Sequence, residues 1–391
     1  MTTSLRRTGR GGALALAASL LLAAPAVAQH DVARARTTVA DDAAHGPITV
    51  HWNALARPLV GGHGGTGMAT RPLALLSVAQ QVASLEAKAP QAREVAVAAA
   101  SAGVLAYLYP AEASHFRDAL RAQRTAAARA GMDAAVAASA DSIGRAVAAR
   151  VIARAKADRS DAAWRGTVPT GTGLWTSAAG AAPVGASWAG IRPWVLTAPE
   201  QFRPAAPPAV GTRAFAADLA EVQQAVRHRT PAQLASARKW AEAPMAGYWN
   251  EVATELIARD GLAEPKAAEV LAALNVALMD ANIACFDAKY AYWSIRPSQA
   301  DTTLDVPVML PNFPAYPSGH ACLSAAAAEV LGAFFPAQRD TLDATAQEVA
   351  DSRLYAGVHY RLDNDVGMEI GRKVARLAVV AVTQGTLELA P

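Results

Sequence analysis

Three short segments in the last third of the chain carry side chains suited to chemistry on an anion. The first runs from Lys289 to Arg296 and is followed by Pro297. Lys289 and Arg296 are seven residues apart, so in a continuous helix they would share one face, two turns apart. Two cations on one face repel unless a negative group lies between them. The pair therefore indicates either an anion clamp or a solvated basic stripe, and Pro297 is expected to help end the helix.

The second segment reads Pro317, Ser318, Gly319 and His320, and an apolar run over residues 321–335 follows it. A serine in this position suits a helix N-cap, and glycine lets a ligand approach the backbone. Free N–H groups at a helix start attract anions, and His320 can carry a proton in the same place. The alternative is an ordinary capped helix.

The third segment contains Arg353, His359 and Asp363. Arg353 offers a planar fork of donors that matches a tetrahedral oxyanion. His359 offers a ring nitrogen as nucleophile or ligand, and Asp363 can hold the other ring nitrogen and so orient the ring. Each segment has an ordinary explanation by itself. Their presence in one chain favours a single site for a tetrahedral oxyanion.

In order, the segments read Lys-x6-Arg-Pro, Pro-Ser-Gly-His and Ser-Arg-x5-His-x3-Asp, with every position filled between residues 289 and 363. This pattern resembles the signature of the superfamily that joins type 2 phosphatidic acid phosphatases, bacterial acid phosphatases and vanadium-dependent haloperoxidases. The core of the resemblance covers residues 282–375. A looser likeness to bacterial haloperoxidase-like proteins extends upstream, through residues 249–251, 173–175 and 191–193.

The resemblance implies an all-α fold, a large helical bundle of the vanadium haloperoxidase and acid phosphatase type. It also implies roles for the signature residues. The side chains and backbone that would hold the equatorial oxygens of the anion belong to Lys289, Arg296, Ser318, Gly319 and Arg353. His359 would be the axial partner, which attacks phosphorus in a phosphatase or coordinates vanadium in a haloperoxidase. His320 would be the acid–base, and Asp363 completes the catalytic set.

The signature leaves the reaction open, because one cage can hold phosphate or vanadate. The upstream likeness, the bulky helical region before the signature and the apolar segment 313–316 favour a vanadate-dependent haloperoxidase acting on peroxide and halide. The short stretch of 31 residues between His320 and Ser352 favours an acid phosphatase. That enzyme would need no metal and would hydrolyse soluble phosphate esters through a phosphohistidine. A non-catalytic oxyanion-binding protein is a third alternative, against which the two histidines count.

The elements that position these segments read as helices. Apolar residues recur with helical period from residue 71 to about 158, and again over 214–228, 231–242, 249–259, 264–295, 318–335, 344–355 and 365–386. Residues 164–211 differ, because they are rich in Pro, Gly and Trp and predict a long loop, either a lid or mouth for the site or a cover that packs aromatics on the bundle. We expect one α-helical domain over residues 71–391.

The amino end of the chain is typical of a secretory signal peptide. Residues 1–28 combine a basic start, a short apolar run and a small-x-small site, which predicts cleavage after Ala28 and export to the periplasm or beyond. Without these residues 33 basic side chains face 33 acidic ones, so we expect no nucleic-acid partner. No later stretch reaches 18 uninterrupted apolar residues, which predicts a soluble mature chain without a membrane span. Alanine-rich helix surfaces allow a homodimer.

Residues 29–70 are rich in Gly, His and Thr and are expected to be irregular. His45, His51 and His63 within them suggest either a metal site or a loosely ordered mature N-terminus, since no second ligand cluster stands at a defined spacing. Cys285 and Cys322 are the only cysteines, and both flank signature residues. An exported compartment permits a disulfide between them, and two buried free thiols fit equally well.

Overall fold

The computed structural model describes residues 46–61, 70–177 and 181–389. These residues form helices and loops, and their one β-type pairing is an isolated bridge between Leu174 and Ser294. The prediction of an all-α fold is confirmed. The helices are α2 (Ile48–Gly61), α3 (Thr70–Glu86), α4 (Pro90–Leu108), α5 (Ala113–Arg129), α6 (Ala134–Ala157), α7 (Arg213–Arg227), α8 (Pro231–Glu242), α9 (Met245–Arg259), α10 (Glu264–Tyr292), α11 (Pro297–Ala300), α12 (Gly319–Phe334), α13 (Arg339–Tyr355) and α14 (Arg361–Thr383).

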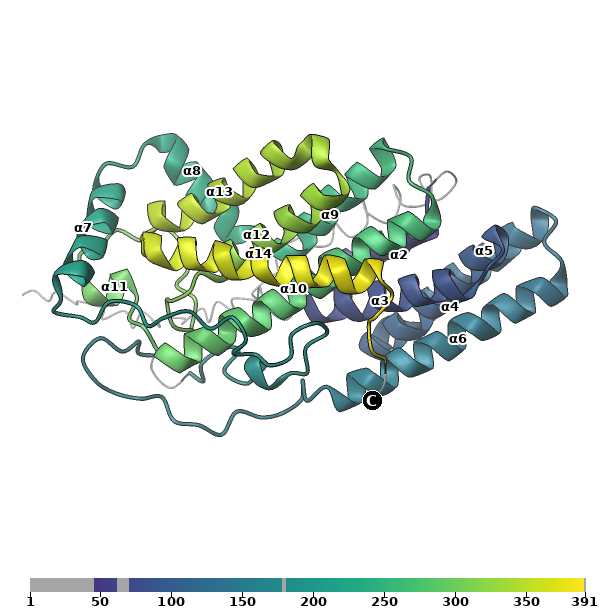
Figure 1. The fold of residues 1–391 in the computed structure, drawn as a ribbon, viewed down its shortest axis with the longest axis horizontal. Helices are drawn as coiled ribbons and strands as arrows, with labels where there is room; N and C mark the ends of the chain where they lie inside the picture. The colour runs from purple at the N-terminus through teal and green to yellow at the C-terminus, as the bar shows by residue number, and fades with distance from the viewer. Residues whose placement is uncertain (1–45, 62–69, 178–180, 390–391) are drawn as a thin grey trace, which may run out of the picture.

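Helix α10 runs through the middle of the bundle, with α3, α12 and α14 packed along it (Figure 1). Its 29 residues are apolar around most of its circumference, as expected for a helix surrounded by other helices. By length and composition α10 is the one described helix that could cross a membrane, but 94% of its most apolar window is buried inside the protein. Its central position therefore accounts for its apolar sequence.

Helices α12 and α14 approach each other closely because α14 presents glycines at the contact. A Cβ atom on Gly371 would lie 2.1 Å from the carbonyl oxygen of Cys322, and one on Gly367 would lie 2.6 Å from that of Ser318. The backbone N–H of Ser318 also donates to the carbonyl of Asp363 at 2.8 Å. The close packing therefore joins the second signature segment to the third.

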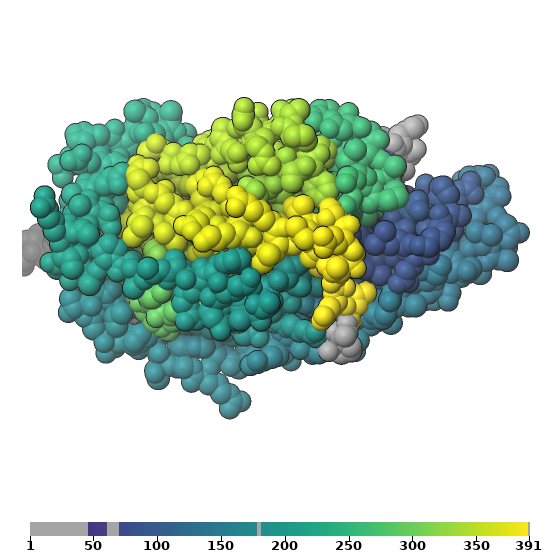
Figure 2. Space-filling view, viewed as in Figure 1, coloured from purple at the N-terminus to yellow at the C-terminus, as the bar shows by residue number. Residues whose placement is uncertain are grey.

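Helices α4, α5 and α6 extend away from this core at one end of the molecule (Figures 1 and 2). Small residues again set the approach, since a Cβ on Gly144 of α6 would lie 2.2 Å from the carbonyl oxygen of Ala96 on α4. The signature segments lie in other helices, so this extension supports the bundle without reaching the site.

The long loop predicted over residues 164–211 is present between α6 and α7, with a short 3-10 helix at Trp188–Gly190. It is fastened along α10 by two carboxylates. Asp280 accepts hydrogen bonds from the backbone N–H groups of residues 194–196, the shortest at 2.7 Å. Asp287 accepts two from Arg203, both at 2.7 Å. Trp188 packs on Phe286 with ring centroids 4.3 Å apart, so the loop covers α10 with aromatic side chains.

One expectation for the amino-terminal region was wrong. Residues 48–61 form α2 and Thr70 begins α3, where irregular chain was expected. The cause is tertiary, because Trp52 is fully buried and the N–H of Thr49 donates to the Glu264 carboxylate on α10. His45, His63 and the predicted signal peptide lie outside the described residues. Within the described part, no group of three His, Cys, Asp or Glu side chains could hold a metal ion.

The glycine contact between α12 and α14 generates a stability prediction. Gly371→Ala forces a methyl group against a backbone carbonyl, so it should lower the free energy of unfolding by about 1–3 kcal/mol. Gly190→Ala is the matched control, since nothing lies within 4 Å of its added Cβ. Urea unfolding followed by circular dichroism measures both. Equal midpoints for the two variants would contradict the packing argument.

Candidate active site

The first signature segment leaves the helix before it reaches Arg296. Helix α10 ends at Tyr292, Trp293 has a left-handed backbone (φ 51), and Arg296 is the N-cap of α11. The expectation that Lys289 and Arg296 share one helix face was therefore wrong, and Pro297 begins a helix instead of helping to end one. The cause is the long loop, because Trp175 donates to the Trp293 carbonyl at 2.6 Å and draws the chain out of the helix.

Lys289 and Arg296 nevertheless converge, because both donate to the carbonyls of one short loop, residues 313–317. The Lys289 ammonium donates to the carbonyls of Pro314 and Ala315, each at 2.9 Å, and also to that of Pro317. The Arg296 guanidinium donates to Phe313 at 3.0 Å and to Val358 at 2.7 Å. The two buried cations therefore hold residues 313–317, the segment that leads into the start of α12.

The start of α12 is a capped helix end, as both interpretations of the second segment require. Ser318 is the N-cap, and its hydroxyl accepts from the N–H of Ala321 at 3.4 Å. The N–H groups of Gly319 and His320 lie in the first turn, where no helical carbonyl can accept from them. Nothing lies within 4 Å of a Cβ placed on Gly319, which leaves open space beside these donors.

The partners of His359 determine which ring nitrogen is free for chemistry. Nδ1 lies 2.9 Å from a carboxylate oxygen of Asp363, and Nε2 lies 3.0 Å from Nη1 of Arg296. A guanidinium only donates, so Nε2 must hold the lone pair and Nδ1 the proton. Asp363 is itself held by the N–H of Tyr360 at 3.1 Å. His359 therefore has its lone pair on Nε2, and Asp363 holds the other ring nitrogen as expected. Its role as nucleophile or ligand stays a prediction.

Arg353 is the cation of the site that has N–H groups without a hydrogen-bond partner among the described residues. Its side chain is 2% exposed, and its Nε and Nη1 groups have no hydrogen-bond partner among the described residues. It lies close enough to lower the pKa of both His320 and His359. Buried donors in folded proteins are almost always matched by an acceptor. The free N–H groups of Arg353 therefore suit a bound anion.

The charges of the site do not balance. Burial, together with the proximity of Arg296, lowers the pKa of Lys289 to about 8 and the pKa of Arg353 to about 10. Burial raises the pKa of Asp363, the carboxylate among the predicted site residues, to about 7. Burial and the nearby cations hold the pKa of both histidines well below the usual value. Near neutral pH the site therefore carries excess positive charge.

These features together fit a tetrahedral oxyanion, phosphate or vanadate. The free donors of Arg353, the first turn of α12 and the open space beside Gly319 suit its oxygens, and His359 Nε2 suits an axial bond. All eight predicted site residues come together. The sequence reasoning missed Trp240, whose carbonyl contacts His320, and the loop carbonyls that hold the two cations. Every residue has a carbonyl, so no residue-type signal marks these partners.

The two cysteines, for which a disulfide and free thiols were both open, are buried free thiols. Cys285 lies one helical turn before Lys289, and its sulfur is 3.8 Å from the carbonyl oxygen of Pro317. A hydrogen bond with Cys322 and the Lys289 charge lower the pKa of Cys285 against the opposing effect of burial. The two cysteines therefore lie next to the site, close to Lys289.

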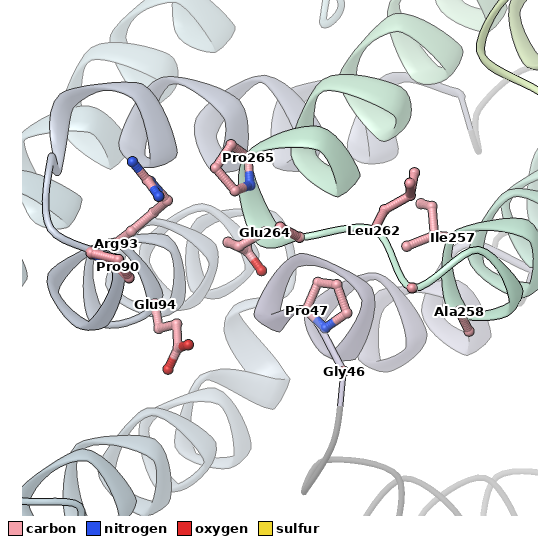
Figure 3. Close-up of a pocket in the computed structure, with 12 residues that line it drawn as sticks. Gly46, Pro47, Pro90, Arg93, Glu94, Ile257, Ala258, Leu262, Glu264 and Pro265 are labelled. Carbon is pink, nitrogen blue, oxygen red and sulfur yellow. The ribbon is translucent and has the colours of Figure 1, made fainter.

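A cavity among the described residues lies away from this site. It encloses about 540 Å³ and is lined by residues that include Glu94, Ile257 and Glu264, at the opposite end of α10 (Figure 3). Glu264 and Lys289 are 25 positions apart in one helix, so about 37 Å separates the cavity from the site at a rise of 1.5 Å per residue. Charge and donor geometry, and not this cavity, mark the candidate active site.

Comparison with known proteins agrees with the predicted resemblance. Residues 270–386, which contain the whole signature, match the family model of the PAP2 superfamily. No curated protein matches the chain. By its signature region and its helical fold, the chain resembles the superfamily of type 2 phosphatidic acid phosphatases and vanadium-dependent haloperoxidases.

The fold as a whole is similar to solved bacterial vanadium haloperoxidases. A bacterial vanadium-dependent iodoperoxidase superimposes with a TM-score of 0.70 at 21% identity, over 85% of this chain and 94% of that one. An apo bacterial vanadium-dependent chloroperoxidase gives 0.68 at 15% identity, over 83% and 95%. The holo form gives 0.65 at 16% identity, over 81% and 91%. At such identities the likeness establishes the fold.

The charge imbalance predicts how anion binding depends on pH. Sulfate is a tetrahedral probe whose own charge does not change near pH 8. The affinity of the protein for sulfate should fall about tenfold as the pH rises from about 7 to about 9. Lys289, whose pKa is about 8, loses its proton over this range, and the site loses one attractive charge. Isothermal titration calorimetry measures the affinity. Lys289→Gln should bind weakly with a flatter profile, whereas the exposed Lys373→Gln should keep the wild-type profile. A wild-type affinity that is constant across pH 8 would refute the argument.

Proposed function

We propose that this chain is a vanadate-dependent haloperoxidase, an enzyme that uses hydrogen peroxide to oxidise a halide. The observation that carries the proposal is the extent of the fold likeness. The family model covers residues 270–386, but the similarity to the bacterial iodoperoxidase covers 85% of the chain. The helices upstream of the signature therefore share the haloperoxidase arrangement as well as the signature region.

Different residues of the site would hold different parts of a bound vanadate. Arg353, Ser318 and the N–H groups at the start of α12 would bind oxygens of the anion. Lys289 and Arg296 would balance its negative charge. His359 would hold it through Nε2, the ring nitrogen that now lies beside Arg296 Nη1. When bound, vanadate supplies a Lewis-acid centre that activates hydrogen peroxide towards a halide.

The proton chemistry belongs to His320 and Asp363. His320 is neutral in this site at neutral pH, because burial and Arg353 depress its pKa. It can therefore take a proton from peroxide and return one to the product. Asp363 fixes the tautomer of His359 and balances positive charge that develops on its ring.

An acid phosphatase is the alternative, favoured by the PAP2 family match and by the 31 residues between His320 and Ser352. In that reaction Nε2 of His359 would attack phosphorus, the P–O bond to the alcohol would break, and His320, in its protonated form, would give its proton to the leaving oxygen. Water would then hydrolyse the phosphohistidine. This chemistry uses the same donors and needs no metal, and a chain with neither activity would be a binding protein.

Two assays on the purified protein separate these functions. We expect bromide- or iodide-dependent halogenation with added vanadate and peroxide, and little hydrolysis of p-nitrophenyl phosphate. His359→Ala should reduce turnover by at least about a thousandfold, because the axial partner is lost. His228→Ala, an exposed histidine at the end of α7, is the control and should be fully active. Hydrolysis that vanadate inhibits, without halogenation, would establish the phosphatase instead.

We also propose that the enzyme is exported. The support is the sequence of residues 1–28, which lie outside the described residues. Amino-terminal sequencing of protein recovered from the periplasm or the medium should give a chain that begins at Gln29. An intact amino terminus on protein from the cytoplasm would count against export.

A further inference from the structure

His320 is held by a contact from outside the signature. Its Nε2 lies 3.0 Å from the backbone oxygen of Trp240, which belongs to α8. A carbonyl oxygen only accepts hydrogen bonds, so Nε2 must carry the proton. In the neutral ring, Nδ1 then holds the lone pair. The contact with α8 therefore selects which nitrogen of His320 can exchange a proton with a bound substrate.

The Trp240 carbonyl is available because of its place in α8. The last four carbonyls of a helix have no helical partner, and Trp240 lies in the last turn of α8. The preceding carbonyl, that of Lys239, is already used by the N–H of Ala243 at 3.1 Å. Helix ends of this kind carry partial negative charge, which favours an imidazole N–H and a protonated ring. The contact stabilises both the selected tautomer and the charged state that proton transfer creates.

Glu348 on α13 fixes the end of α8. Its carboxylate accepts from Nε1 of Trp240 at 2.7 Å and from the Ser236 hydroxyl at 3.2 Å, and the Lys239 ammonium lies 3.6 Å away. Lys239 and Glu348 are both about half exposed, so their ion pair contributes little. The Trp240 side chain is fully buried, which makes its bond to Glu348 the strong member of the set.

Tertiary contacts hold helix α8 in place, and the bond between Trp240 and Glu348 is one of them. It has 12 residues, and its buried side chains are Ala237 and Trp240. A helix of this length has little stability of its own and takes its position from tertiary contacts. If the bond between Trp240 and Glu348 is lost, the last turn of α8 is free to shift, and its carbonyl shifts with it. His320 would then be able to adopt the other tautomer.

We propose that Glu348 is a positioning residue, which acts through Trp240 and the end of α8 to keep Nδ1 of His320 as the proton-exchanging nitrogen. The proposal rests on the proposed function only in assigning acid–base work to His320. The tautomer itself is a property of the folded chain and is measurable without any substrate.

The test compares three variants of the full chain. Glu348→Ala removes the acceptor for Trp240, whereas Glu348→Gln keeps an amide oxygen in its place. Glu329→Ala is the matched control, because Glu329 also joins helices, through Arg376 at 3.0 Å, and its ion pairs among the described residues do not reach α8. The tautomer of His320 is read from ¹⁵N spectra of histidine-labelled protein, with the signal assigned by its loss in His320→Gln.

We expect wild type, Glu348→Gln and Glu329→Ala to show a single tautomer protonated at Nε2. Glu348→Ala should show a mixture, a roughly ten- to hundredfold lower kcat and a displaced pH profile, with KM little changed. Trp240→Phe should have the same effect, and combining it with Glu348→Ala should add nothing, because both remove one bond. If Glu348→Ala does not fold, Trp240→Phe decides the question.

A wild-type His320 protonated at Nδ1 would overturn the proposal. So would a Glu348→Ala or Trp240→Phe variant that retains the wild-type tautomer and pH profile. If the wild type neither halogenates nor hydrolyses phosphate esters, the proposed function fails. The spectra still decide the positioning role of Glu348 in that case.

Discussion

The burial of Lys289, Arg296 and Arg353 beside the Asp363 carboxylate is the constraint on which the rest of the structure depends. A buried charge is costly unless polar groups replace the water that it loses. Lys289 and Arg296 receive those groups from backbone carbonyls of residues 313–317 and 358. Arg353 keeps unmatched N–H groups. The fold therefore provides internal acceptors for two cations and leaves N–H groups of the third without an acceptor among the described residues.

The bundle has to hold these charged groups at fixed positions relative to one another. Three signature segments lie at the ends of different helices, so small changes in helix packing move one segment relative to another. The glycines of α14 remove that freedom, since they place its backbone against the first turns of α12. The N–H of Ser318 then bonds directly to the carbonyl of Asp363. The close packing of α12 and α14 is therefore also what fixes the geometry of the site.

The same cage suits phosphorus and vanadium chemistry for a physical reason. Both reactions place negative charge on equatorial oxygens and need a nitrogen lone pair on the axis, with a proton carrier nearby. The signature supplies only these parts. The features that distinguish phosphatases from haloperoxidases must therefore lie outside the signature, in the upstream helices and the long loop that surround the site. His320 illustrates this, since its partner Trp240 lies in α8, some 80 residues earlier in the chain.

The sequence alone determined the helical fold, the chemical identity of the site residues and the local relations among them. Ser318 at the N-cap and the four-residue spacing of His359 and Asp363 are set within a few residues, so both were predictable. Only the tertiary structure decided that α10 ends before Arg296, that residues 48–61 are helical, and that α8 holds His320. Each depends on partners far along the chain, and several of those partners are backbone carbonyls, which every residue shares.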